Sequence, residues 1–388
     1  MANILFFLNR YPGVGGIETV TNTLINSLGA ENDIYVIAYD CMQGYELPKY
    51  VKKAFYFPGD KWCEESNITY YNQIIRERQI THVIVQGMYT FMIDIALNDA
   101  RDRNVKVISA LHGAPGYERI EYLAGRSQKP LAKIVRNIKL KLGVNKSYNR
   151  HRKRWREAYL KAVNESEKVV LLCEDYIDEF CKLYSIPKSE KLCAIANPLP
   201  ESYLHNQLPD FSRKENVILF VGRLTFEKNV QVMLAAWKKL QPRLAGWKFR
   251  IVGDGLEREK LEQYVRVHNI SCAEFVGAVS DPSEYYRKAK MLLLLSKFEG
   301  FGMVLTEAQS FGVIPVAYPS SSGVKSIIED GGGVMVNSMK PEVIADVVYA
   351  LAGDENKMKA LSATVHEKSA LYKTDVIAAR WRQLIAGK

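Results

Sequence analysis

The chain has 388 residues, of which 47% are hydrophobic and 25% are charged. This length allows two domains with a core each, and this composition excludes an intrinsically disordered protein. The formal net charge of +10 arises in one segment, because residues 126–156 contain twelve Lys or Arg and no Asp or Glu.

No apolar run approaches the ~20 residues that cross a bilayer, and the N-terminal run over 4–8 is too short for a signal peptide. The six cysteines form no Cys-x-x-Cys pair, which argues against a zinc site, a redox motif or a disulfide framework. We therefore expect a cytoplasmic protein.

Short apolar segments alternate with helical patterns in the first half of the chain. Apolar residues recur at helical spacing over 17–28, and Gly29 is placed to end that helix. Strands are predicted over 3–8, 34–38, 82–85, 105–110, 168–173 and 191–195. This alternation is typical of α/β folds with a parallel sheet.

A proline-rich connection divides the chain near residue 200. Asn197-Pro-Leu-Pro-Glu201 and Pro209 interrupt regular structure. The alternation then restarts, with strands predicted over 217–221, 248–252, 274–276, 291–295, 314–317 and 334–336 and further helix from 341 onward. We therefore predict an α/β fold of two Rossmann-like domains, 1–198 and 210–375, facing a central cleft, with a last helix over 376–388. In such sheets ligands bind at the carboxyl ends of the strands.

Three glycines follow the first predicted strand. Gly13, Gly15 and Gly16 would let backbone N–H groups approach an anion at the start of the next helix. A plain tight turn explains them about as well. Glu18 stands where a Gly-x-Gly-x-x-Gly motif needs its third glycine, which counts against a nicotinamide site.

Two cations follow the first strand of the second half. Arg223 and Lys228 lie in the loop after 217–221, where Arg could bind a diphosphate through two hydrogen bonds and Lys as a point charge. Two solvated loop cations are the alternative, and for an isolated pair of cations it is the better one.

The most informative stretch is 297–312, which follows a predicted strand. Gly300 and Gly302 open a helix whose unpaired N–H groups form a second anion site. Glu299 precedes this helix, and Glu307 lies ~7–8 Å along its axis. Two such carboxylates could accept hydroxyl hydrogen bonds from both ends of a sugar–diphosphate–ribose ligand, but they do not suit the ~5 Å pair of a retaining hydrolase. A helix-capping Glu and a surface Glu are the alternative, which explains less because Glu307 stands among apolar and small residues.

His112 follows the predicted strand over 105–110. At that edge of a parallel sheet an imidazole could donate to a substrate hydroxyl or phosphate, and a structural role is an equal alternative. The chain contains no Asp-x-Asp, the usual acidic clamp for a metal-bound nucleotide diphosphate. We therefore expect no metal, and stabilisation of the leaving group by Arg223, Lys228 and a helix N-terminus.

At these residues the sequence resembles the retaining nucleotide-sugar glycosyltransferases of family 4, which have the GT-B fold. The most specific match is Glu299-Gly-Phe-Gly with Glu307, the E-x7-E motif of that family. The supporting matches are Val221-Gly-Arg-Leu with Glu227-Lys228, Val252-Gly-Asp-Gly and Gly312-Val-Ile-Pro-Val-Ala317. The likeness covers nearly the whole chain. It departs at Asn197-Pro-Leu-Pro, where many members have Asn-Gly-Val, and this variant also occurs in bacterial surface-polysaccharide enzymes.

The resemblance implies a role for each candidate residue. In an acceptor-side first domain, Gly15 and Gly16 lie near phosphate and acceptor and His112 lies near the donor sugar. A second domain binds the nucleotide sugar, with Arg223 and Lys228 on the diphosphate, Glu307 on the ribose, Glu299 on the sugar, and the backbone of Phe301, Gly302, Met303 and Val304 touching sugar and phosphate. His112, Glu299, Arg223 and Lys228 are the implied catalytic residues. The last helix, 376–388, returns to the first domain.

Retention of configuration is commonly assigned, in this family, to a same-face reaction. The departing diphosphate helps to deprotonate the acceptor hydroxyl, so the resemblance implies no protein nucleophile.

The basic segment 126–156 has two amphipathic parts. Apolar residues recur at helical spacing over 131–142, and Tyr148, Trp155 and Tyr159 accompany the cations of 150–156. Such a helix can lie on an anionic bilayer or bind a phosphorylated acceptor. A solvated helix face is the alternative that holds for most charge runs. Twelve cations without an acid among 31 residues favour the membrane or anionic-acceptor interpretation. Nucleic-acid binding ranks well behind it, because it explains neither the donor-site motifs nor the cleft.

Together these features predict a retaining, metal-independent glycosyltransferase that moves a sugar from a nucleoside diphosphate, with UDP expected, to a lipid-linked or surface-glycan acceptor, with an anionic membrane surface as a further partner. The nucleotide sugar is a co-substrate, and no cofactor or nucleic-acid partner is expected. Two alternatives stay open: a nucleotide-sugar epimerase of the same fold, and a non-catalytic protein that binds polyanions or membranes through 126–156.

Overall fold

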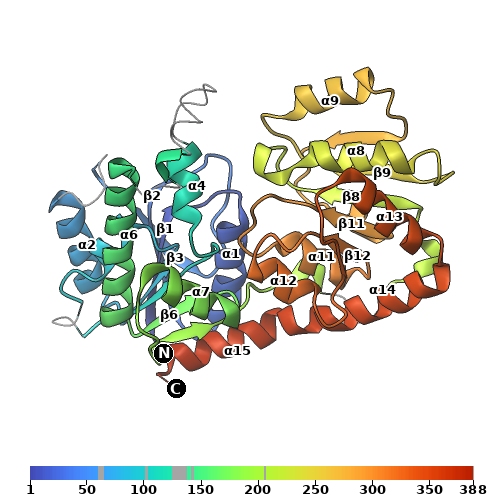
Figure 1. Ribbon diagram of the computed structural model, residues 1–388. Coiled ribbons are helices and arrows are strands. Elements are labelled where there is room, and N and C mark those ends of the chain that lie inside the picture. Colours follow the sequence, from blue (N-terminus) through green and yellow to red (C-terminus); the bar gives the residue numbers. More distant parts are fainter. Residues whose placement is uncertain (60–64, 101–103, 125–137, 141–143, 205–206, 388) are drawn as a thin grey trace. The chain divides into compact units, whose positions relative to one another are not determined.

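The computed structural model describes residues 1–59, 65–100, 104–124, 138–140, 144–204 and 207–387. These residues form two compact units, Met1–Ala196 with Ala378–Lys388, and Asn197–Ile377 (Figure 1). Each unit contains one parallel sheet whose strands alternate with helices. The predicted α/β class with two Rossmann-like domains is confirmed. Most of the basic helix predicted over 131–142 lies outside the described residues.

The first unit is built on seven parallel strands in the order β3-β2-β1-β4-β5-β6-β7. The strand order reverses between β1 and β4, and a reversal of this kind opens a crevice at the carboxyl ends of the two strands. The strands are β1 (Asn3–Arg10), β2 (Asp33–Asp40), β3 (Val51–Tyr56), β4 (His82–Gln86), β5 (Lys106–Ala110), β6 (Lys168–Leu171) and β7 (Leu192–Ala194). The helices are α1 (Gly16–Leu28), α2 (Glu65–Glu77), α3 (Thr90–Ala96), α4 (Tyr117–Ala124), α6 (Lys146–Glu165) and α7 (Glu174–Tyr184).

One strand of this sheet, β3, is absent from the sequence-based predictions. It lies at the edge of the sheet, and Phe55 is its one buried side chain. Lys52 and Lys53 are charged, as is common on edge strands, and Lys52 pairs with Asp33 of β2 at 2.6 Å. An edge strand with so little apolar surface has no pattern by which it could be recognised.

The second unit is built on six parallel strands in the order β10-β9-β8-β11-β12-β13, which reverses between β8 and β11. The strands are β8 (Val217–Val221), β9 (Lys248–Val252), β10 (Ala273–Gly277), β11 (Met291–Leu294), β12 (Ile314–Ala317) and β13 (Val334–Met335). The α-helices are α8 (Val230–Leu240), α9 (Arg258–Val267), α10 (Ser283–Lys288), α11 (Met303–Ser310), α12 (Ser322–Ile328), α13 (Pro341–Ala352) and α14 (Glu355–Ser369). The last helix, α15 (Thr374–Ile385), begins in this unit, and its residues from Ala378 onward belong to the first unit. Short 3₁₀ helices are η1 (Glu201–Tyr203), η2 (Phe211–Arg213), η3 (Phe226–Lys228) and η4 (Ala370–Tyr372).

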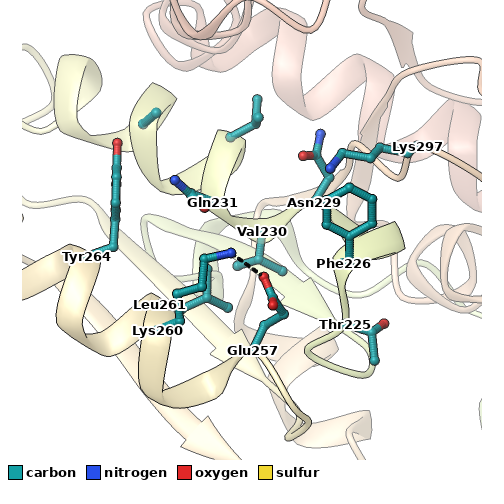
Figure 2. Close-up of a pocket in the computed structure, with 12 residues that line it drawn as sticks. Thr225, Phe226, Asn229, Val230, Gln231, Glu257, Lys260, Leu261, Tyr264 and Lys297 are labelled. Carbon is teal, nitrogen blue, oxygen red and sulfur yellow. Dashed lines mark hydrogen bonds and ion pairs between the residues drawn. The ribbon is translucent and has the colours of Figure 1, made fainter. Parts of the chain in front are cut away.

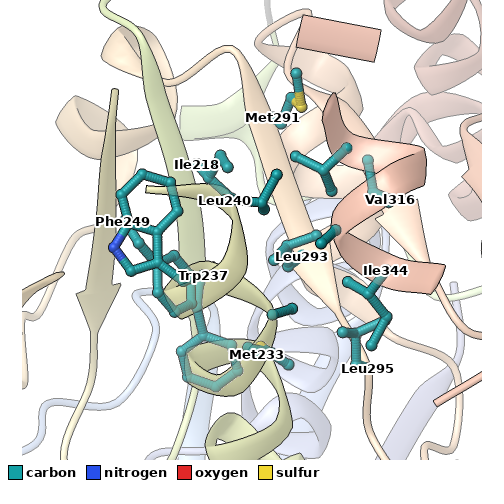
Figure 3. Packing of buried hydrophobic residues seen from close by; sticks show 14 of the residues in the cluster. Ile218, Met233, Trp237, Leu240, Phe249, Met291, Leu293, Leu295, Val316 and Ile344 are labelled. Atoms are coloured by element: carbon teal, nitrogen blue, oxygen red, sulfur yellow. The ribbon is translucent and has the colours of Figure 1, made fainter. Parts of the chain in front are cut away.

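The core of the second unit lies between its sheet and α8 and α13 (Figure 3). Trp237 of α8 is 1% exposed and packs on Phe249 of β9, with ring centroids 6.3 Å apart. Its indole Nε1 donates to Ser271 O at 2.8 Å, so the one polar atom of the ring is satisfied. This core holds β8 in place. The loop after β8 carries Arg223 and Lys228, the first residues that are predicted to bind the nucleotide sugar.

The two chain segments near the domain boundary bond to each other within the second unit. Leu199 N donates to Tyr372 O at 2.8 Å, and Thr374 Oγ1 donates to Leu199 O at 2.5 Å. Residues Ala378–Lys388 belong to the first unit, where Arg382 Nη2 donates to Ser27 O at 2.7 Å. In the structure the units therefore divide at Ala196/Asn197 and at Ile377/Ala378. The sequence-based boundaries differ slightly: the first domain is predicted to end at 198, the second to begin at 210 and the last helix to begin at 376.

Two motif glycines approach each other closely at the carboxyl ends of β8 and β9. Gly253 has φ +138°, and a Cβ on it would overlap the carbonyl oxygen of Gly222. We expect Gly253→Ala to lower the free energy of unfolding by about 3 kcal/mol or more, because backbone strain and overlap add. Urea unfolding followed by circular dichroism measures this loss.

Gly246 supplies the matched control. It has φ +79°, and a Cβ there would meet no heavy atom within 4 Å. Gly246→Ala is expected to cost about 1 kcal/mol from strain alone. Equal losses in the two variants would show that the contact between the motif glycines is unimportant for stability.

Candidate active site

The loops after β8 and β11 bring together two residues that are predicted to bind the nucleotide-sugar donor. Lys228 ends η3, and Glu299 lies in the loop after β11. Lys228 Nζ forms an ion pair with Glu299 Oε2 at 2.6 Å, and Ser296 Oγ donates to the same oxygen at 3.2 Å. The two charged side chains are 19% and 15% exposed. The cation predicted for the diphosphate and the acid predicted for the sugar are therefore partners of each other in the structure.

Arg223 lies in the same loop and is exposed. In the part of the chain that the structure describes, its guanidinium has no hydrogen-bond or ion-pair partner. The next residue, Leu224, is buried, and its N–H donates to Asp254 O at 2.8 Å. The backbone is thus held in place, while the guanidinium is available to a phosphate.

Helix α11 begins after the loop that carries the first carboxylate. Its N-cap residue, Gly302, has φ +86°, and a side chain there would press on Leu294 and Leu305. No described side chain caps the helix, and its first N–H groups have no intrahelical partner. Phe301 is buried and packs edge-on against Tyr372, with centroids 5.9 Å apart. The predicted segment therefore forms a helix N-terminus that can bind an anion.

The second carboxylate, Glu307, lies farther along α11 and is partly buried. Tyr286 Oη of α10 donates to Glu307 Oε2 at 2.7 Å. Burial raises the pKa of Glu307 to about 7, and the bond from Tyr286 opposes that rise. Tyr286 is missing from the sequence-based candidates, because nothing in its local pattern distinguishes it from any other buried helix residue.

The glycine loop after β1 leads into α1, with Gly15 at the N-cap. No described side chain donates or accepts a capping bond there. The side chain of Glu18 folds over Gly15, at the place where a Cβ would otherwise stand. A carboxylate already lies against this helix N-terminus, which makes it a weaker anion site than the N-terminus of α11.

His112 follows β5, and its Nε2 contacts Gln86 Oε1 at the end of β4. Gln86 is 1% exposed, and its register partner on β5 is Ala110. Among the described residues Gln86 Nε2 has no hydrogen-bond partner. Sequence reasoning did not select Gln86, although its position at the carboxyl end of a predicted strand was a usable signal.

Two described cations of the basic segment donate to backbone carbonyl groups, and a third, Lys153, pairs with Glu157 at 3.7 Å. Arg152 Nη2 of α6 donates to Leu183 O at 3.0 Å, and Arg156 Nε donates to Tyr184 O at 2.8 Å. These carbonyl groups end α7, and cations stabilise a helix C-terminus. Lys146, Arg150 and Arg154 are exposed on α6 at a spacing of four residues.

The aromatic residues of this segment do not all accompany its cations at the surface. Trp155 and Tyr159 are 8% and 2% exposed, and Tyr159 packs edge-on against Tyr184 at 4.7 Å. Trp155 and Tyr159 are four residues apart on α6, so both side chains lie on the helix face that packs on the core of the first unit. The expectation that these aromatic residues contact a membrane or acceptor is therefore wrong for Trp155 and Tyr159.

A pocket of about 320 Å³ lies beside the loop that follows β8, between α8 and α9 (Figure 2). Phe226 of η3 is 63% exposed at its rim, and Lys297 Nζ lies 3.3 Å from the centroid of that ring. Lys260 pairs with Glu257 at 2.8 Å on the α9 side. Neither predicted carboxylate lines this pocket, so it is separate from the Lys228–Glu299 pair.

Residues 206–368 match the family model "Glycosyl transferases group 1". An uncharacterized glycosyltransferase of Haemophilus influenzae is 32% identical over 349 residues, which cover 85% of this chain and 84% of that protein. The chain belongs to the group 1 glycosyltransferases. The resemblance inferred from the motifs is thereby confirmed at the level of a group 1 glycosyltransferase, as is the expectation that the protein is an enzyme.

Other comparisons place this glycosyltransferase beside enzymes with named ligands. An α-1,4-N-acetyl-D-galactosaminyltransferase of Campylobacter jejuni, which acts on a PP-undecaprenol-linked saccharide, is 34% identical over 45% of this chain. The chain spans 48% of that protein, and two further curated relatives are matched over 20% and 62% of their lengths. Anabaena HepE in complex with UDP and glucose shares the fold with a TM-score of 0.77 at 14% identity, over 100% of both chains.

Within the described ranges, no helix combines the length and the apolar character needed to cross a bilayer.

Because Glu299 pairs with Lys228, we expect it to compete with the phosphate groups of a nucleotide for this cation when no sugar is attached. Glu299→Gln removes the negative charge that pairs with Lys228 and so releases this cation. We expect UDP to bind the variant about 3- to 10-fold more tightly, a change of about 1 kcal/mol. Isothermal titration calorimetry measures it.

Glu257→Gln is the matched control, because Glu257 pairs with Lys260 at a similar distance outside the carboxylate site. It is expected to leave UDP affinity unchanged. An unchanged affinity in Glu299→Gln as well would mean that the pair does not compete with the diphosphate.

Proposed function

We propose that this glycosyltransferase is a retaining, metal-independent enzyme that transfers a sugar from a nucleoside diphosphate, UDP, to a lipid-linked or surface-glycan acceptor. The observation that carries the proposal is the gathering of Lys228, Glu299 and the uncapped N-terminus of α11 at one edge of the second sheet. Arg223 adds an available cation to the same loop.

In this proposal the second unit binds the donor. Arg223, Lys228 and the amides of residues 301–304 bind the diphosphate, Glu299 accepts from sugar hydroxyls, and Glu307 accepts from the ribose. The charge that develops on the departing diphosphate meets two cations and a helix dipole, and this stabilisation replaces a metal clamp.

The first unit supplies the acceptor side. His112, whose Nε2 donates to Gln86 Oε1, hydrogen-bonds a hydroxyl of the donor sugar through its other ring nitrogen, and the loop of Gly15 and Gly16 lies beside the acceptor. The bond from the anomeric carbon to the phosphate oxygen breaks, the acceptor oxygen bonds to that carbon on the same face, and the acceptor proton moves to the departing phosphate. No protein nucleophile takes part.

The nucleotide and the acceptor class rest on relatives and on charge. UDP is the nucleotide bound in HepE, and the Campylobacter enzyme acts on an undecaprenol-linked saccharide. A lipid-linked acceptor lies at a membrane surface, and the exposed cations Lys146, Arg150 and Arg154 suit an anionic headgroup or an acceptor phosphate. The enzyme is accordingly proposed to be cytoplasmic and peripheral on the inner face of the membrane.

Donor binding tests this proposal directly. Calorimetric titration with UDP, GDP and ADP is expected to show UDP binding and much weaker binding of the other two. Glu299→Ala is expected to lower UDP release from a panel of UDP-hexoses at least 100-fold, because the sugar loses an acceptor that the transition state needs.

The circular dichroism spectrum and unfolding midpoint of Glu299→Ala establish that the fold is intact, and Glu257→Ala is the control for loss of one acid. Absence of binding by all three nucleotides would refute the proposal. Near-full turnover by Glu299→Ala would remove Glu299 from the sugar site.

The membrane surface is tested by co-sedimentation with vesicles of phosphatidylglycerol and phosphatidylcholine. Replacing Arg150, Lys153 and Arg154 by Gln is expected to weaken binding about tenfold or more, since each cation contributes about 1 kcal/mol near an anionic surface. Added salt should weaken the wild type in the same direction.

The control variant replaces the exposed Lys238, Lys357 and Lys359 of the second unit by Gln, which removes the same charge elsewhere. Arg152 and Arg156 are kept in both variants because they cap α7. Equal binding by the two variants would exclude α6 as the membrane-binding element.

A further inference from the structure

Glu307 is held by a neutral partner and not by a cation. Tyr286 is 0% exposed, and its hydroxyl donates to Glu307 Oε2 at 2.7 Å. A Lys or Arg at this place would neutralise the carboxylate. A tyrosine instead fixes its direction and leaves the negative charge for a ligand.

The ring of Tyr286 is itself tightly held. It stacks on Phe311 with centroids 5.6 Å apart, and Tyr203 of η1 packs edge-on against it at 6.2 Å. Tyr203 Oη donates in turn to Asp281 Oδ1 at 3.2 Å. Because Phe311 and Tyr203 hold the ring of Tyr286 in place, its hydroxyl has one direction in which to donate.

The polar and charged groups around the Tyr286–Glu307 bond come from several elements. Tyr286 and Arg287 lie on α10, and the guanidinium of Arg287 lies 5.7 Å from the Phe311 centroid. Tyr203 lies on η1 and Asp281 in the loop before α10. Burial raises the pKa of Tyr203, and the nearby carboxylates of Glu307 and Asp281 raise it further. On the α14 side, His366 Nδ1 contacts Ser310 O at 2.9 Å. Of these, only Tyr286 bonds the carboxylate in the described structure.

We propose that Tyr286 is a positioning residue that aims the Glu307 carboxylate at the hydroxyl groups of the nucleotide ribose. This inference rests on the proposed function, in which Glu307 binds the ribose. With Tyr286 on Oε2, the other carboxylate oxygen is directed to the ligand. The enzyme's preference for a ribonucleotide over a nucleotide without ribose hydroxyls then depends on a residue that never touches the nucleotide.

The pH dependence follows from the same bond. Burial raises the pKa of Glu307 to about 7, and the Tyr286 hydrogen bond lowers it by favouring the charged form. The carboxylate accepts from ribose hydroxyls above that pH, so UDP affinity is expected to fall as pH drops through about 7. Loss of the hydrogen bond raises the pKa further, so the fall begins at a higher pH.

The test compares UDP with 2′,3′-dideoxy-UDP in calorimetric titrations between about pH 6 and pH 9. Tyr286→Phe removes one oxygen and keeps the ring that packs on Phe311 and Tyr203. It is expected to weaken UDP about 3- to 10-fold at neutral pH and to leave dideoxy-UDP unchanged. Its UDP affinity should decline from a higher pH than that of the wild type.

Two further variants separate positioning from packing. Tyr203→Phe loses a bond to Asp281 but none to Glu307, so it is expected to keep the wild-type ratio of the two nucleotides. Glu307→Gln should abolish the pH dependence and reduce the ratio as Tyr286→Phe does.

Equal weakening of both nucleotides in Tyr286→Phe would assign Tyr286 a purely structural role and overturn the inference. An unchanged ratio with an unchanged pH profile would overturn it as well. If the wild type binds neither nucleotide, the proposed function itself fails, and the inference fails with it. Binding of UDP by the wild type with no change in Tyr286→Phe refutes the inference alone.

Discussion

Every strand pairing within the two sheets is parallel, and this constraint decides where polar side chains can stand. A parallel strand has its backbone bonded on both sides and its faces covered by helices, so charged groups are accommodated at the strand ends. In the second unit the strand order reverses between β8 and β11. The chain therefore leaves these two neighbouring strands in different directions, which leaves room between their loops. Lys228 and Glu299, which are 71 residues apart, meet there.

The two motif carboxylates differ in the partner that the fold gives them. Glu299 pairs with a cation and a hydroxyl, so its charge is balanced before any ligand is considered. Glu307 has a tyrosine as its partner and a pKa near neutrality because burial is not offset by an opposite charge. One acid is therefore paired with Lys228, and the other keeps a charge that responds to pH. A single motif thus supplies two acids with different chemistry.

The basic segment shows how one charge run divides into different uses. Arg152 and Arg156 bond the carbonyl groups that end α7, and Trp155 lies in the core. These residues are needed for the fold of the first unit. Lys146, Arg150 and Arg154 are exposed on α6 and bond no carbonyl group of α7 in the described structure. The net charge of +10 therefore overstates what α6 can offer to an anionic partner.

The sequence by itself determined the fold class and the family, and it predicted twelve of the thirteen strands that the structure describes, all but the edge strand β3. These features depend on local apolar runs and on motif spacing. The sequence also located Arg223, Lys228, Glu299, Glu307 and His112 in loops or helices at strand ends. Tertiary structure alone decided that Lys228 pairs with Glu299, that Tyr286 holds Glu307 and that Gln86 contacts His112. Each of these contacts joins segments at least 21 residues apart. Their proximity is set by strand order and helix packing, which no local pattern records.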